Sequence, residues 1–395
     1  MGESMSRPIV DAPAFAAEPE GLEKEGRQWG SLSLEIQLWV EVLLLVLIGF
    51  IMIFSASSIV ALRKFSDPAY YLKRQLICML LGVGAMVVLS RIHYKVYRKY
   101  SGYALVGAMA ALVLVLVPGV GSELNNARRW FHLKGFLLQP AEYAKVAWVL
   151  YLSVSLWRKQ DRIKQMRVSF WPHIILCGIV CGLILKEPDF GTTVLIGSLT
   201  MVLMATGGVP CRSLFVLLPV VVAGVYKFVF LVPWRLERVT AFWNPWTDPL
   251  DSGYQLIQAW IAVGTGGLWG KGLGAGELKL FYLPEPFTDF ILAVIGEELG
   301  LAGITAVCLL FFFFFRTGLQ ISRNAPDQYG SLLALGLTML ITLQALLNMG
   351  VVLGLFPTKG LPLPFISYGG SAFTANCLAV GMLMSVARNT EERSE

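Results

Sequence analysis

The sequence predicts an all-α polytopic membrane protein of about ten transmembrane helices, and three observations predict it. First, 56% of the 395 residues are hydrophobic and 15% are charged, whereas soluble domains average about 45–50% and about 25%. Second, mean hydropathy is +0.64, and apolar residues gather in stretches near the roughly 20 that a membrane helix needs. Third, basic residues concentrate in a few loops. The scattered net charge of +6 argues against a nucleic-acid binder.

Residues 1–36 are polar and lack the basic and then apolar segments of a cleaved signal peptide. They predict a disordered cytoplasmic tail, followed by one transmembrane domain over 37–388 and a short cytoplasmic tail over 389–395. We expect the spans near 37–58, 70–90, 101–118, 139–157, 170–186, 190–206, 212–232, 287–315, 330–354 and 367–387.

Basic residues set the orientation. The loops 91–100 and 157–169 carry nine Lys and Arg residues in 23 positions, which marks both loops as cytoplasmic. Because the number of spans is even, both termini share that side. The loop near 59–74 on the opposite face has four basic residues and weakens this pattern without reversing it.

The opposite, outer face carries a long loop over about 233–286 that is rich in Trp, Pro, Gly and Tyr. Long loops in compact domains are usually functional. Polar residues gather in the outer loops and at the outer ends of the spans, whereas a transporter would place them at mid-membrane on broken helices. The pattern favours chemistry at the outer membrane surface.

Two polar groups lie around the third and fourth spans. Arg128 and Arg129 stand on an outer loop, where Arg suits bidentate binding of phosphate; anchoring to lipid headgroups is the alternative. Pro140 can open a helix, which sets Glu142 and Lys145 three residues apart as an ion pair. Such a pair in a membrane is a functional candidate, and a structural staple is equally compatible.

Two further outer segments carry charge. Lys186–Thr193 is a tight turn between two spans. Its charged side chains can serve only to keep the turn in contact with water. Arg235 and Arg238 share one face if their segment is helical. The glycine run 264–276 is not a P-loop, because Gly272 follows Lys271 where Ser or Thr is required.

Asp289 opens a long apolar stretch and heads a narrow stripe of small residues (Ala293, Gly296, Gly300, Gly303), against which a helix or a lipid tail can pack. A helix N-cap is the alternative reading of Asp289. Glu297 and Glu298 need partners so deep in a span.

The Pro- and Gly-rich stretch 357–371, with Lys359 and Ser367, fits the wall of a polar cavity. Gln344 and Asn348 precede it, one helical turn apart. The six cysteines and three histidines form no disulfide framework or zinc pattern.

Together these segments resemble the SEDS family (shape, elongation, division and sporulation) of bacterial cell-wall proteins, from about Leu38 to Arg388. The matching pieces are Phe54–Ser58, Ala127–Trp130, Gln139–Lys145, Pro188–Thr192, Leu283–Phe290, Gly296–Gly300 and Ile366–Ser371. The paired Arg128 and Arg129, and Pro357–Leu361, match the division member rather than the elongation member. Asn126, Ala141, Pro286 and Phe287 depart from the family pattern, and none of these changes removes a charge.

The resemblance implies a peptidoglycan glycosyltransferase that polymerises lipid II at the division septum, with its active site facing outward from the cytoplasmic membrane. The family's essential acid maps to Asp289, which we expect to be the general base of an inverting transfer. The candidate diphosphate ligands are Arg128, Arg129, Lys145, Arg235, Arg238 and Lys359; the candidate supports of the cavity are Glu142, Glu297, Gln344 and Ser367.

The resemblance does not establish a cofactor, and the candidate is a divalent cation, Mg²⁺ or Mn²⁺. It implies as partners a class B penicillin-binding protein, which is a transpeptidase, other division proteins, and the growing undecaprenyl-linked glycan. A lipid II flippase, an elongation-type polymerase and a non-catalytic scaffold are the alternatives.

Overall fold

The structure is a computed structural model that describes residues 33–391 except 125–126, 134–135, 217–218, 220–223, 225, 227–231, 278, 280–285 and 359. Most of both predicted tails, and most of the expected span 212–232, therefore lie outside the described residues. Around that span, α8 (Cys211–Phe215) is described.

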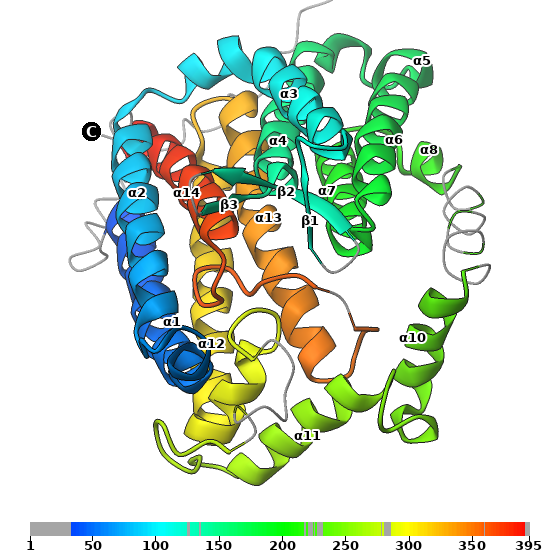
Figure 1. Cartoon of the computed structure of the whole chain (residues 1–395). Coiled ribbons are helices and arrows are strands. Elements are labelled where there is room, and N and C mark those ends of the chain that lie inside the picture. The colour runs from blue at the N-terminus through cyan, green and yellow to red at the C-terminus, as the bar shows by residue number, and fades with distance from the viewer. Residues whose placement is uncertain are drawn as a thin grey trace, which may run out of the picture. The chain divides into compact units, whose positions relative to one another are not determined.

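Helices make up most of the described part of the membrane domain (Figure 1). Seven described helical segments are long and apolar enough to cross a membrane. They are α1 (Leu34–Phe65), α2 (Tyr70–Arg91), α3 (Lys95–Leu116), α5 with α6 (Met166–Ser169 and Trp171–Lys186), α12 (Ile291–Asn324), α13 (Gln328–Val352) and α14 (Gly370–Glu391). The expected spans 139–157 and 190–206 correspond to α4 (Pro140–Arg158) and the shorter α7 (Phe190–Thr206). The multi-pass helical fold is confirmed, and the exact number of ten is not.

Local signals explain where several helices begin. Ser33 caps α1 by accepting a hydrogen bond from the Ile36 N–H, and Asp327 caps α13 through the Gly330 N–H. Pro140 stands in the first turn of α4, where its missing N–H is harmless.

Burial separates the central helices from those that face lipid. Of the most apolar windows, 72% of residues are buried in α13 and 78% in α14, against 22% in both α2 and α3. Large apolar side chains such as Leu80, Leu81 and Val106 are exposed along α2 and α3. In a membrane these side chains meet acyl chains, so α13 and α14 form the centre of the domain.

The two ends of the domain meet. Arg388 near the end of α14 binds Glu35 in the first turn of α1, with Nη2 2.5 Å from Oε1. This ion pair joins the first turn of α1 to the last turn of α14.

The loops that the sequence predicts to be outer contain secondary structure that it did not predict. A three-stranded antiparallel sheet of order β1-β2-β3 follows α3; its strands are Ser122–Leu124, Ala127–Leu133 and Phe136–Leu138. The loop 233–286 contains α10 (Pro233–Trp243), a 3₁₀ turn η3 (Pro245–Thr247) and α11 (Tyr254–Gly266). Figure 1 shows α10 and α11 together at one end of the helices.

Helix α12 is broken at Gly300, whose φ of 67° and ψ of −162° are not helical. In an unbroken helix the N–H groups of residues 301 and 302 would bind the carbonyls of 297 and 298. Instead, the segment Gly267–Gly272 supplies hydrogen-bond partners both for these two N–H groups and for these two carbonyls. The replacements are Lys271 N to Glu297 O (3.0 Å), Gly272 N to Glu298 O (3.0 Å), Leu301 N to Gly267 O (2.9 Å) and Ala302 N to Leu268 O (3.1 Å). We call this segment the spliced loop.

The break changes the reading of the small-residue stripe. A Cβ on Gly266 would stand 1.9 Å from the Gly296 carbonyl, and one on Gly300 would stand 2.4 Å from the Gly270 nitrogen. The end of α11 and the spliced loop therefore cover Gly296 and Gly300, which leaves no room there for a lipid tail.

Candidate active site

Asp289 is half-buried and lies in a turn just before α12. Hydrogen bonds hold the backbone carbonyls of this turn. The Ser367 hydroxyl donates to the Thr288 carbonyl at 2.5 Å, and the Asn348 side-chain amide donates to the Asp289 carbonyl at 2.8 Å. The N-cap position of α12 is Phe290, so Asp289 is not the cap. Its carboxylate faces the backbone of Gly360, where an added Cβ would stand 3.0 Å from Oδ2.

A buried polar chain supports the wall opposite this turn. Glu142 and Lys145 form the predicted ion pair, 2.7 Å apart and each at most 2% exposed. Lys145 also donates to Gln344 Oε1 at 2.7 Å, and Gln344 donates to the Pro362 carbonyl at 2.9 Å. These contacts tie α4 through α13 to the segment beside Asp289.

Aromatic rings hold the other side of the turn. The ring of Tyr71 on α2 lies 4.7 Å from that of Phe287 and 5.3 Å from that of Tyr368, measured between centroids. The Tyr368 N–H donates to the Phe287 carbonyl at 2.8 Å. The turn is thus fixed against α2 two residues before Asp289.

Arg128 and Arg129 lie on β2 in different environments. Arg128 pairs with Glu123 across the sheet at 2.9 Å, and both side chains are substantially exposed. Arg129 donates from Nε to the Glu187 carbonyl and from Nη2 to the Pro188 carbonyl, at 2.5 and 2.9 Å. Arg129 therefore fastens the sheet to the turn between α6 and α7.

The turn between α6 and α7 contains a helix cap and a buried acid, so it does more than expose charges to water. Asp189 caps α7 through the Thr192 N–H and hydroxyl. Glu187 is 0% exposed, and its carboxylate oxygens have no hydrogen-bond partner among the described residues. Burial, reinforced by the Asp189 carboxylate and opposed by Arg129, raises the pKa of Glu187 to about 8.

Glu297 and Glu298, both 0% exposed, find the partners that the sequence required. Lys271 Nζ lies 3.0 Å from Glu297 Oε1. Lys279 Nζ lies 2.5 Å from Glu298 Oε1, which the Ser55 hydroxyl also binds at 2.8 Å. The two acids thus clamp the spliced loop and the residues after it to α12 and α1.

Sequence reasoning missed Arg74 on α2. Its guanidinium lies 5.5 Å from the Tyr70 ring centroid and 5.4 Å from that of Phe136 on β3, and it forms no ion pair within the described part of the chain. Its only signal in the sequence was a basic residue near a loop that is predicted to be outer, against the usual charge bias. The stacked cation is thus available to an anion beside the aromatic residues that hold the turn.

Three of the predicted cations cannot be placed. Arg235 and Arg238 stand three residues apart in α10, as predicted, but their side chains lie outside the described residues, as does Lys359. Among the residues that are described, no group of three or more His, Cys, Asp or Glu could hold a metal ion.

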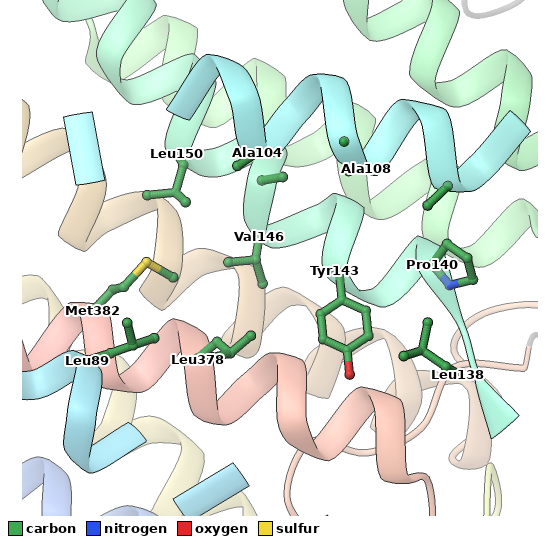
Figure 2. A pocket seen from close by; sticks show the side chains of 13 residues that line it. Leu89, Ala104, Ala108, Leu138, Pro140, Tyr143, Val146, Leu150, Leu378 and Met382 are labelled. Atoms are coloured by element: carbon green, nitrogen blue, oxygen red, sulfur yellow. The ribbon is translucent and has the colours of Figure 1, made fainter. Parts of the chain in front are cut away.

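An apolar cavity of about 440 Å³ opens between α2, α3, α4 and α14. Figure 2 shows Tyr143 and Val146 of α4, Leu378 of α14 and Ala108 of α3 around it. The Tyr143 hydroxyl is hydrogen-bonded to the Thr374 hydroxyl at 2.7 Å. Because the other lining side chains are apolar, the cavity suits a hydrocarbon chain.

Comparisons with known proteins agree with this architecture. A family model described as "Cell cycle protein", covering FtsW, RodA and SpoVE, matches residues 35–392. The probable peptidoglycan glycosyltransferase FtsW of Geobacter metallireducens is 42% identical over 339 residues, 86% of this chain and 90% of that protein. Stage V sporulation protein E of Bacillus subtilis is 42% identical over 355 residues, 90% of this chain and 97% of that protein.

Two solved structures share the fold. One was described under the words "Structural coordination of polymerization and crosslinking by a peptidoglycan synthase complex"; it has a TM-score of 0.73 and 28% identity, and covers 89% of this chain and 97% of that chain. The rod shape determining protein RodA of Thermus thermophilus has a TM-score of 0.66 and 26% identity, and covers 89% of this chain and 96% of its own.

Proposed function

The chain belongs to the FtsW/RodA/SpoVE family, and on that premise we propose that it is a peptidoglycan glycosyltransferase that polymerises lipid II. The observation that carries the proposal is the half-buried Asp289 carboxylate on a turn whose carbonyls are held by Ser367 and Asn348. A general base needs such fixed placement, because proton transfer requires hydrogen-bond reach.

The chemistry assigns roles to the charged groups. A β-1,4 bond formed from an α-linked diphosphate donor inverts the anomeric centre, so one base must take the proton of the attacking 4-hydroxyl. Asp289 is that base, and cations stabilise the departing diphosphate. A divalent cation bound with the substrate would supply the same charge stabilisation.

The environments of the cations favour some as diphosphate ligands. Arg128 is exposed, and its surface pair with Glu123 is worth only about 0–1 kcal/mol, so it can turn to phosphate at little cost. Arg74 joins it, and Arg235, Arg238 and Lys359 stay in the proposed set. Arg129 and the buried Lys145 are engaged with protein partners, so we assign them to support of the site, with Glu142, Gln344 and Glu297.

The undecaprenyl chain would occupy the cavity between α2, α3, α4 and α14 rather than the stripe below Asp289, which protein covers. We place the active site on the outer face of the cytoplasmic membrane, at the division septum. Similarity to proteins named FtsW at about 42% identity favours the division role over an elongation role. The complex among the structural relatives supports a class B penicillin-binding protein as partner.

The test is polymerisation of lipid II by the purified protein with its cognate partner, whose transpeptidase is blocked. Wild type should give glycan strands on a gel, whereas Asp289→Ala and Asp289→Asn, folded and bound to the partner, should give none. Strands from both variants would exclude Asp289 as the base. No strands from wild type would favour a flippase or a scaffold.

A further inference from the structure

Asn348 on α13 joins the two segments that meet at Asp289. It is 2% exposed, and its Nδ2 donates to the Asp289 carbonyl at 2.8 Å and to the Leu361 carbonyl at 2.7 Å. Because both neighbours can only accept, the side-chain amide has one orientation. Its Oδ1 has no hydrogen-bond partner among the described residues, so both links depend on one nitrogen.

These two hydrogen bonds fix the distance between the Asp289 carbonyl and the Leu361 carbonyl. The Asp289 turn lies on one side of the amide, and on the other lies the segment that contains Gly360, against which the carboxylate rests. Gln344, one turn earlier on α13, holds the next carbonyl of that segment, on Pro362. Helix α13 is largely buried, and it contacts both segments through Asn348 and Gln344.

We propose that Asn348 is a positioning residue for the glycosyl transfer: by bridging the carbonyls of Asp289 and Leu361, it fixes where the Asp289 carboxylate stands. This inference rests on the proposed function, in which Asp289 is the base. Asn348 acts through the Asp289 backbone, because its own side chain is 2% exposed. A displacement of about 1 Å in a reacting group can lower the rate about 100-fold.

The test compares Asn348→Leu, which keeps the shape and removes both donors, with Thr342→Val on the same helix. Thr342 is buried, and its hydroxyl has no hydrogen-bond partner among the described residues, so its loss disturbs no link to Asp289. Initial rates of lipid II polymerisation give kcat and KM for the folded, partner-bound fraction of each variant.

We expect Asn348→Leu to lower kcat by about 10- to 100-fold with KM within about twofold of wild type, and Thr342→Val to change neither. If Asn348→Leu does not fold, Asn348→Ser, which retains one donor, should give a smaller loss of kcat at unchanged KM. A kcat equal to that of Thr342→Val would overturn the inference.

Asp289→Asn, measured in parallel, separates the two proposals. If Asp289→Asn is inactive while the Asn348 variant retains full kcat, only the positioning role fails. If Asp289→Asn polymerises lipid II, the base assignment fails, and the positioning role fails with it.

Discussion

At the scale of single residues, the domain buries several ionisable side chains around the candidate site, and most of them are paired. Glu142, Glu297 and Glu298 each have a lysine within 3.0 Å. Glu187 differs, because its carboxylate oxygens accept no hydrogen bond from the described residues. Burial without a partner favours the neutral acid, which makes this side chain a source of pH dependence.

Replacing Glu187 with Gln should stabilise the protein at alkaline pH. The folded-state pKa of about 8 lies above the ordinary value of 4.5, so the wild type loses stability as pH rises from about 4.5 to about 8 and is level above that. The loss is at most on the order of a few kcal/mol. Melting in detergent should show a higher Tm for Glu187→Gln at pH 8 and little difference at pH 5. Equal shifts at both pH values would contradict the assignment.

Gly360→Ala should lower the transfer rate without unfolding the protein. The new methyl group would stand 3.0 Å from Asp289 Oδ2, so the carboxylate must move by a few tenths of an ångström. Among the described residues beyond its chain neighbours, only Asp289 lies within 4 Å of the added methyl carbon. We expect kcat to fall several-fold at unchanged Tm. A wild-type kcat would show that the carboxylate does not need this position.

The sequence could predict local pairs but not distant ones. Glu142 and Lys145 are three residues apart after a proline, and helix geometry alone brings them together. Asn348 and Asp289 are 59 residues apart, and Arg129 binds carbonyls that any residue type could offer. Such contacts depend on how the helices pack, and the residue types alone do not specify that packing.

At the scale of elements, the break in α12 is the feature that sequence patterning describes least well. The spacing of small residues predicted one continuous stripe, and Gly296 and Gly300 do lie close together. The stripe accommodates protein backbone, because the spliced loop replaces helical hydrogen bonds on both sides of Gly300. Patterns of small residues indicate close approach but not which element approaches.

Gly300→Ala should therefore disrupt the site from a distance. Its φ of 67° disfavours alanine, and the Cβ would stand 2.4 Å from the Gly270 nitrogen. We expect a loss of stability of more than about 1 kcal/mol together with reduced polymerisation, read as Tm and as strand yield. Gly102→Ala on α3 is the matched control, because nothing lies within 4 Å of its Cβ. An equal change in Tm and in strand yield for the two variants would argue against a structural role for the contact between Gly300 and the spliced loop.

Filling the apolar cavity should weaken substrate binding. Ala147 lines the cavity, and Ala147→Phe would occupy part of its 440 Å³. We expect a several-fold higher KM for lipid II with a full undecaprenyl chain, and a smaller change for a short-chain analogue. Ala110→Phe, at an exposed position of α3 outside the cavity lining, is the control. An unchanged KM for the long-chain substrate would place the prenyl chain elsewhere.

At the scale of the whole molecule, hydropathy predicted the architecture well because the membrane enforces it. A spanning segment must satisfy its backbone internally, so apolar stretches of the right length become helices. The same logic gives no information on the outer loops, where water is present. The sheet after α3 and the helices α10 and α11 were therefore missed as elements, although the sequence identified both regions as functional candidates.

The orientation that the basic loops predict can be tested directly. Lys164, in the loop between α4 and α6, and Asp251, between η3 and α11, are both exposed. In a cysteine-free background, a membrane-impermeant maleimide should label Asp251→Cys in intact spheroplasts and Lys164→Cys only after permeabilisation. The ion pair between Glu35 and Arg388 joins the two ends of the domain, and the positive-inside tendency predicts that they lie on the cytoplasmic side. Labelling in the reverse order would turn Asp289 toward the cytoplasm and exclude polymerisation at the outer surface.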